Sequence, residues 1–299
     1  MEIKKCQKCG SDNIISVKLD PDCIEEMQEA YTECKDCGFE IRERKVIEII
    51  QNLREKDKED RRKELWEDAF EEDSLDEKKW SVIKRNKADW GNYMSDNPEC
   101  IVIQDGMIHL RGIVNPNQSK DPVQYHTGGI ETKGKFAFQY GKVEIRVKLE
   151  SAQGAWPAIW MLADEPRYGQ YPKNGEIDLM EHLNDESRIY QTVHSYYTLE
   201  LKQKNNPGNY ATTSINPDDF NIFGLVWDPD WLIFTVNNRV SFVYPRVKNV
   251  DPSQWPFDQP FYLMIDQQLG GAWVGDVNPA DLPVQLIVDW VRVYKRADY

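Results

Sequence analysis

The sequence predicts an all-β protein, an antiparallel sandwich of jelly-roll type, preceded by a small cysteine-rich domain and a charged helical linker. Three observations carry this prediction. Five of the six cysteines fall within the first 45 residues, a nearly continuous run of charged residues follows at 54–63, and helical periodicity disappears from about Phe70 onward. Beyond that point short apolar runs alternate with polar residues, as in the strands of an antiparallel sandwich. We therefore expect domains at 1–45, 46–66 and 67–299.

Alternation identifies the strands of the predicted sandwich. In residues 143–149 the odd-numbered side chains are apolar and the even-numbered ones are charged, which gives the strand one apolar face. Similar runs occur at 108–110, 232–236 and 286–294, and turn signals separate the runs at 128–129, 237–238 and 278–279. The region is larger than a simple immunoglobulin-like sandwich. It suits two broad, curved sheets whose concave face offers a groove to an extended polymer.

The cysteine-rich region contains two Cys-x-x-Cys-Gly pairs, Cys6 with Cys9 and Cys34 with Cys37. Four thiolates in two such pairs suit a tetrahedral structural Zn²⁺. The alternative is two disulfides, which form in oxidising compartments. The region resembles a zinc ribbon, a unit that binds nucleic acid, docks proteins or serves stability. Its mixed charge favours docking to a protein partner or a structural role.

Residues 46–66 form the predicted helical linker. Val46, Ile49, Ile50 and Leu53 recur at helical spacing, and the charged run at 54–63 has mixed signs and neither glycine nor proline. Such a run is typical of a solvated helical spacer.

Composition limits the partners. The chain has 299 residues and a formal net charge of −14, which disfavours nucleic acid and sulfated polysaccharides through Coulomb repulsion but leaves neutral polysaccharides acceptable. The sequence has neither an apolar run of membrane-spanning length nor an apolar stretch behind its first basic residues. We expect a cytoplasmic protein without a membrane partner, and export by a non-standard route stays open. Cys100 precedes an apolar run and is predicted to lie in the core, whereas Cys23 is predicted to be a spare thiol.

The segment 175–181 carries three acids among large apolar residues. Glu176 and Asp178 share one face of a regular strand, and Glu181 points to the other face. A β-bulge at Leu179 or Met180 adds one residue and returns Glu181 to the face of the other two acids. The segment therefore predicts three carboxylates on one surface, with apolar residues anchored in the core behind them.

Crowded carboxylates raise one another's pKa, which costs stability. Retaining glycoside hydrolysis needs this arrangement, because one carboxylate attacks the sugar while a nearby carboxylic acid donates a proton. The alternative is a solvated acidic edge strand, which the intervening Ile, Leu and Met residues disfavour.

These motifs, in this order, resemble glycoside hydrolase family 16, which includes laminarinases, lichenases, agarases and carrageenases. Besides the acidic segment, the resemblance rests on residues 128–136, 140–146, 156–162, 193–194, 256–261, 270–273 and 289–294. It covers about Phe70 to Tyr294 and implies a concanavalin A-like jelly roll. The longer acidic motif with its bulge resembles the laminarinase-like branch, whose members are endo-β-1,3(4)-glucanases.

The resemblance assigns roles to the three acids. Glu176 corresponds to the family nucleophile and Glu181 to the acid/base. Asp178 corresponds to the central aspartate, which holds the nucleophile and modulates its charge. No organic cofactor is implied for catalysis.

Three further residues are implied for substrate binding. Trp156 and Trp160 match tryptophans that line the groove, and they lie four apart, hence on one face of a strand. The alternative for this pair is core packing. His194 matches a histidine next to the acids, where it could bond a carboxylate or a sugar hydroxyl, or serve structure alone.

Two departures limit the resemblance. The family often has Asp-Glu-Phe near its start and places calcium between that region and a late strand. This chain has Asp68-Ala69-Phe70, with Asp289 on the late strand, and lacks the Glu, so calcium is a weak expectation. Residues 265–269 stand where many laminarinases carry an Asn-rich stretch, which leaves the linkage preference open.

The expected function is retaining endo-hydrolysis of a neutral β-1,3- or mixed-linkage β-1,3/1,4-glucan. The alternatives are a galactan hydrolase of agarose type, a transglycosylase that uses the same residues, and a non-catalytic carbohydrate-binding protein on the same fold.

Overall fold

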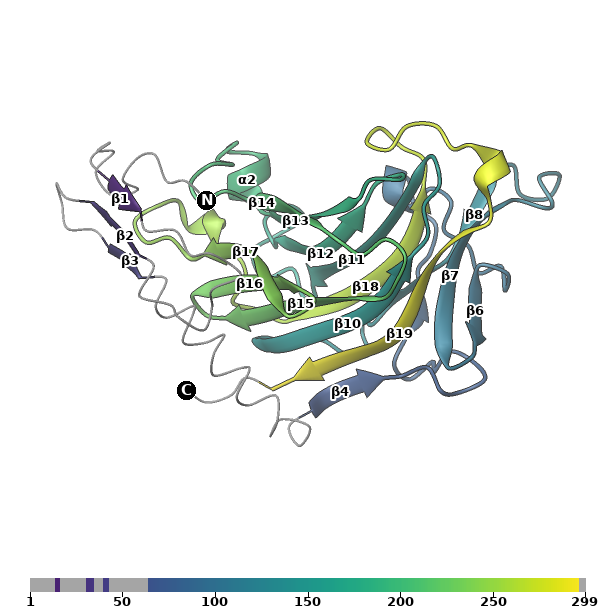
Figure 1. The fold of residues 1–299 in the computed structure, drawn as a ribbon, viewed down its shortest axis with the longest axis horizontal. Coiled ribbons are helices and arrows are strands. Elements are labelled where there is room, and N and C mark those ends of the chain that lie inside the picture. Colours follow the sequence, from purple (N-terminus) through teal and green to yellow (C-terminus); the bar gives the residue numbers. More distant parts are fainter. Residues whose placement is uncertain (1–13, 17–30, 35–39, 43–63, 296–299) are drawn as a thin grey trace. The chain divides into compact units, whose positions relative to one another are not determined.

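The computed structural model describes residues 14–16, 31–34, 40–42 and 64–295 (Figure 1). The chain divides into two compact units, residues 1–63 and 64–299. In the first unit, β1 (Ile14–Ser16), β2 (Tyr31–Cys34) and β3 (Glu40–Arg42) form an antiparallel sheet in that order. Cys6, Cys9, Cys23 and Cys37 lie outside the described residues, as does the side chain of Cys34. The zinc site therefore stays a prediction.

The second unit is a sandwich of two antiparallel sheets, as predicted, and Figure 1 shows them packed face to face. The outer sheet has the order β17-β16-β15-β10-β19-β7-β6, and β4 and β8 extend it by pairing with β19 and β7. Its strands are β4 (Glu64–Asp68), β6 (Ile101–Gln104), β7 (Met107–Val114), β8 (Tyr125–Thr127), β10 (Gly141–Leu149), β15 (Asn221–Asp228), β16 (Trp231–Val236), β17 (Arg239–Pro245) and β19 (Val284–Tyr294).

The inner sheet has the order β14-β13-β12-β11-β18-β9-β5. Its strands are β5 (Ser81–Val82), β9 (Gly129–Glu131), β11 (Ala155–Ala163), β12 (Glu176–His182), β13 (Arg188–His194), β14 (Tyr210–Ser214) and β18 (Phe261–Leu269). Within residues 64–295, helical structure is limited to α2 (Tyr196–Leu199) and the 3-10 turns η3 (Asp89–Gly91), η4 (Pro252–Gln254) and η5 (Pro279–Asp281). Among the described residues no helix is both long and apolar enough to span a bilayer.

The core lies between the two sheets and follows the predicted alternation. Along β10, Val143, Ile145, Val147 and Leu149 are all buried in one large apolar cluster that both sheets share. Cys100 is also fully buried, as predicted. At the hairpin between β16 and β17, the predicted turn residues Asn237 and Asn238 have φ of 51° and 63°. Asparagine tolerates this left-handed conformation, which a tight hairpin requires.

The predicted linker ends earlier than expected. Residues 64–66 were expected in a helix, but they belong to β4, which pairs with the end of β19. The reason is tertiary packing: Trp66 packs partly buried against the core and stacks on Phe136, with ring centroids 5.0 Å apart. The contacts of Trp66 outweigh the local preference of a charged run for helix.

Candidate active site

The three acids lie on β12, and the predicted bulge brings them to one face. On β11, Ile159 pairs with Met180 and the next residue, Trp160, pairs with Asp178, so that Leu179 is the extra residue. The register of β12 with β13 shifts over the same residues. Leu179 and Met180 are both fully buried in the core cluster. The bulge thus turns Glu181 toward the face that carries Glu176 and Asp178.

These acids form the floor of an open groove of about 530 Å³ on the inner sheet. Trp156 and Trp160 from the neighbouring strand β11 line the same groove, which confirms their predicted common face. The residues lining the groove are Trp90, Trp156, Ala158, Trp160, Glu176, Asp178, Glu181, Tyr190, Thr192, His194, Lys204, Asn209, Tyr210, Gln268 and Trp273.

Glu181 lies in an environment that favours the protonated carboxyl group. Its residue surface is only 9% exposed, and its Oε1 accepts a hydrogen bond of 3.1 Å from the indole Nε1–H of Trp156. Burial, and then the nearby charge of Glu176, raise the pKa of Glu181 to about 8. A carboxyl group with this pKa keeps its proton at neutral pH and can give it to a leaving group.

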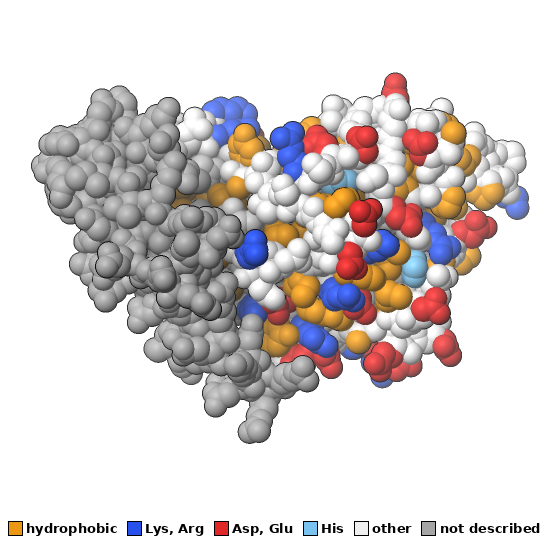
Figure 2. Space-filling model, in the orientation of Figure 1, with side chains coloured by type: hydrophobic (Ala, Val, Ile, Leu, Met, Phe, Trp, Pro, Cys, Tyr) orange, Lys and Arg blue, Asp and Glu red, His pale blue; other side chains and the backbone are white. Residues whose placement is uncertain are grey.

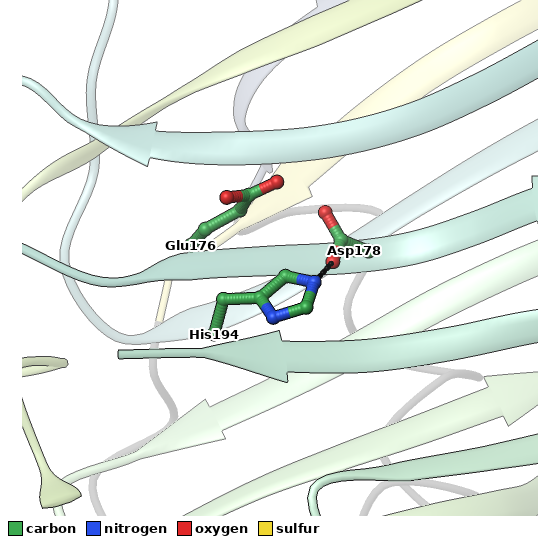
Figure 3. A group of neighbouring side chains, drawn as sticks. All are labelled: Glu176, Asp178 and His194. Atoms are coloured by element: carbon green, nitrogen blue, oxygen red, sulfur yellow. Dashed lines mark ion pairs between the residues drawn. The ribbon is translucent and has the colours of Figure 1, made fainter. Parts of the chain in front are cut away.

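Asp178 lies between the two glutamates and is 2% exposed. Burial, followed by the charges of Glu176 and Glu181, holds the pKa of Asp178 well above its usual range. His194 on β13 is the direct cross-strand partner of Glu176, and its Nε2 lies 3.5 Å from Oδ2 of Asp178 (Figure 3). Burial lowers the pKa of His194, which favours the neutral imidazole. The structure shows the expected contact of this histidine with a carboxylate.

The two predicted tryptophans differ in exposure and in contacts. Trp160 is 5% exposed, donates its indole N–H to Asp266 at 2.8 Å and meets Trp90 edge to face at 4.9 Å. Trp156 is half-buried and meets Trp273 edge to face at 5.4 Å. Trp160 therefore both lines the groove and packs against its neighbours. Trp156 mainly lines the groove.

The sequence analysis missed several residues of this site. Trp90 comes from η3, and Lys204 and Asn209 come from the loop between α2 and β14, so no local pattern links them to the acids. Tyr171 lies in the loop before β12, and burial and the nearby charge of Glu176 raise the pKa of its hydroxyl. For Trp273 a signal existed, because it ends the Gly270-Gly271-Ala272-Trp273 motif, and its residue surface is 45% exposed.

The expectations for metals can be tested on side-chain chemistry. Asp68 accepts hydrogen bonds from the Trp80 indole at 2.7 Å and from the backbone of Phe70 at 3.0 Å, and Asp289 is ion-paired with Arg146. These carboxylates are held by protein donors, and the calcium site stays an expectation of the resemblance. Within the described part of the chain, Glu176, Asp178 and His194 are the one group of three ligand atoms within 4.8 Å of one another, and this group belongs to the groove floor.

Charge is mixed on the face of the sandwich that Figure 2 shows, where Asp and Glu side chains are interspersed with Lys and Arg. Strand β12 instead carries three acids within six residues.

Known proteins resemble this chain over most of the sandwich. The family described as glycosyl hydrolases family 16 matches residues 82–292. The chain belongs to glycoside hydrolase family 16. This confirms the resemblance, which was based on motifs spread over the same range. Figure 1 and the strand order agree with the jelly roll that the family implies.

Similar family 16 proteins differ in substrate. The keratan-sulfate endo-1,4-beta-galactosidase of Sphingobacterium multivorum is 41% identical over 235 residues, which cover 77% of this chain and 54% of that protein. The chain thus spans about half the length of that relative. A beta-glucanase of Rhodothermus marinus is 33% identical over 246 residues, covering 77% of this chain and 84% of the glucanase.

Solved structures give the same result for the fold. The laminarinase from Rhodothermus marinus superposes with a TM-score of 0.71 at 30% identity, over 79% of this chain and 98% of that structure. The similarity covers the sandwich that carries the groove.

Proposed function

We propose that this chain is a retaining endo-glycoside hydrolase that cleaves β-1,3- or mixed-linkage β-1,3/1,4-glucan. Glu181 donates its proton to the departing glycosidic oxygen while Glu176 attacks the anomeric carbon and forms a covalent glycosyl-enzyme. Glu181, now ionised, takes a proton from water, whose oxygen attacks the same carbon and releases Glu176. Two inversions at one carbon leave its configuration unchanged.

The observation that carries this proposal is the difference between the two glutamates. Glu181 is enclosed and bonded to Trp156, with its pKa raised to about 8, whereas Glu176 lies half-buried at the start of β12. Asp178 stands between them, with His194 beside it. A groove that is open and lined by aromatic faces suits the interior of a neutral polysaccharide. The glucanase and laminarinase relatives support the glucan as substrate.

A product analysis with a nucleophile variant tests the proposal. The wild-type protein should release oligosaccharides from laminarin, lichenan or barley glucan, and proton NMR should detect the β-anomer first. Glu176→Gln should fold normally and lose more than about 1,000-fold in kcat/KM, because the attacking carboxylate is gone. Initial release of the α-anomer, or near-normal turnover by the variant, contradicts the proposed mechanism.

A galactose-containing chain is the second candidate substrate. The observation in its favour is the galactosidase relative, whose 41% identity exceeds that of the glucanase over a similar length. Gln268, which lines the groove at the position of the laminarinase Asn-rich stretch, agrees with a different sugar. Agarose and keratan sulfate should be tested in the same assay. If the protein releases products from one of these alone, its substrate is a galactose-containing chain and not a glucan. The same catalytic groups would act in either case.

A further inference from the structure

One buried carboxylate beside the groove has no role in the mechanism above. Asp266 lies on β18, a strand whose nine residues are all buried, and it is 0% exposed. Its Oδ2 accepts a hydrogen bond from the Trp160 indole at 2.8 Å, and its Oδ1 accepts one from Nε2 of Gln268 at 2.7 Å. Both donor side chains line the groove. Asp266 therefore sits directly behind the groove wall.

Strand register places Asp266 in one row with the proton donor. Ala158 on β11 pairs with Asp266 on one side and with Glu181 on β12 on the other. Directly opposed residues of antiparallel strands project to the same face, so the three side chains share one surface. Two strand spacings of about 4.8 Å separate the outer two backbones. The middle side chain is a single methyl group, which neither carries charge nor donates a hydrogen bond.

We propose that Asp266 is a positioning residue for the general acid: its charge acts across Ala158 to favour the protonated form of Glu181, while its two oxygens fix Trp160 and Gln268 against the groove. The inference rests on the proposed function in naming Glu181 the proton donor. The electrostatic contact itself exists independently of any substrate.

The charges around Glu181 agree with this role. Glu176 and Asp178 face it from β12, Tyr190 and His194 from β13, Asp266 from β18, and Lys204 lines the same groove from its loop. Burial and the charge of Glu176 are the main causes that raise the pKa of Glu181, and the charge of Asp266 acts in the same direction. Burial raises the pKa of Asp266 to about 7.

Asp266→Asn tests the proposal, because it removes the charge and retains an oxygen acceptor for Trp160. Carbon-13 NMR of protein labelled at the glutamate side-chain carboxyls follows Glu181 directly, with its signal assigned by its loss in Glu181→Gln. We expect the pKa of Glu181 to fall by about 0.5 to 1 unit in the variant. The matched control is Asp68→Asn, since Asp68 also accepts a tryptophan indole N–H but lies on the other sheet. It should leave the Glu181 titration in place.

An unchanged Glu181 pKa in Asp266→Asn overturns the proposal, and so does an equal fall in Asp68→Asn. If Asp266→Asn does not fold, Asp266→Ser keeps a smaller acceptor and carries the same expectation. On a glycan that the wild type cleaves, the alkaline limb of the kcat/KM profile should move to lower pH by the same amount, which loss of packing alone would not produce. If the wild type cleaves no glycan, the proposed hydrolase function fails, and the NMR titration still decides whether Asp266 acts on Glu181.

Discussion

Strands β10 and β12 both lie inside their sheets and carry charged residues, but the arrangement of these residues differs between them. On β10 the alternation is regular and most of its charges are paired: Lys142 Nζ lies 2.8 Å from Glu144, and Arg146 pairs with Asp289. On β12 a bulge interrupts the alternation and brings three carboxyl groups together. Oδ2 of Asp178 is buried without a hydrogen bond.

The arrangement of charge on β10 favours stability, whereas the arrangement on β12 favours the chemistry of the groove. On β10, each charge of an ion pair offsets the cost of burying its partner away from water. On β12, the neighbouring carboxyl groups increase the cost of ionising one another. The fold tolerates β12 because the residues behind the acids, Ile177, Leu179 and Met180, are fully buried in the core. The loss of stability from crowded carboxyl groups is confined to the groove. There, two carboxyl groups with different proton affinities can act as proton donor and nucleophile.

The largest expected effect comes from shortening β12. Deleting Ile177 forces one of the three acids off the groove floor, whichever way the bulge relaxes, and should reduce kcat/KM by more than about 1,000-fold. Deleting Leu179 instead removes the extra residue and leaves the acids on one face. That variant should lose about 2–5 kcal/mol of unfolding free energy for the missing core side chain but keep measurable activity.

Urea unfolding and initial rates on the same preparations distinguish the two deletions. Equal loss of activity in both, with both folded by circular dichroism, would show that the bulge itself is required. Equal activity in both would show that the register of the acids does not matter.

A smaller effect is expected from Glu181→Gln on the pH dependence of stability. The folded protein holds the proton of Glu181 up to about pH 8, whereas the unfolded chain releases it near the ordinary glutamate pKa of 4.5. Between these values the wild type loses stability as pH rises, by about 1.4 kcal/mol per pH unit from this group, and the loss levels off above the folded pKa.

Glutamine carries no such proton and still accepts the Trp156 hydrogen bond, so the variant should show a flatter curve and be the more stable protein at about pH 8. Chemical unfolding at several pH values measures this. Exposed Glu72 gives the control, because Glu72→Gln should follow the wild-type curve. Parallel curves for wild type and Glu181→Gln contradict the raised pKa.

The smallest effect is expected on β10. Glu144→Gln leaves the Lys142 ammonium, whose side chain is 11% exposed, without its ion pair, although the cation still lies over the Tyr294 ring at 5.7 Å. We expect a loss of about 1–3 kcal/mol in unfolding free energy. Activity should not change, because Glu144 lies on the sheet opposite the groove. A lower kcat/KM in fully folded Glu144→Gln would show that the charges of β10 affect the groove on the other sheet. It would contradict the separate roles of β10 and β12.

Sequence reasoning reached those parts of the molecule that local periodicity determines. The alternation of 143–149 fixed the inward face of β10, and the spacing of the three acids required the bulge that β12 contains. Trp156 and Trp160 followed from the same period. In each case the information lies within a few residues of the chain.

The rest depends on contacts between distant segments. Every residue of β18 is buried, so no alternation marks Asp266 or Gln268 as facing the groove. Trp90 and Lys204 reach the groove from loops on either side of the acids in sequence. Residues 64–66 read as helix because their strand partner, the end of β19, lies more than 200 residues away. Such placements depend on tertiary packing, which overrides local preference.

The bulge at Leu179 also has an evolutionary meaning. Pairing of β12 with both neighbours resumes in register after the extra residue, with Glu181 opposite Ala158 and Tyr190. A codon gained or lost at this point changes the length of the gene without relocating either glutamate. Insertion or loss of one residue here therefore keeps both glutamates on the same face of the groove floor.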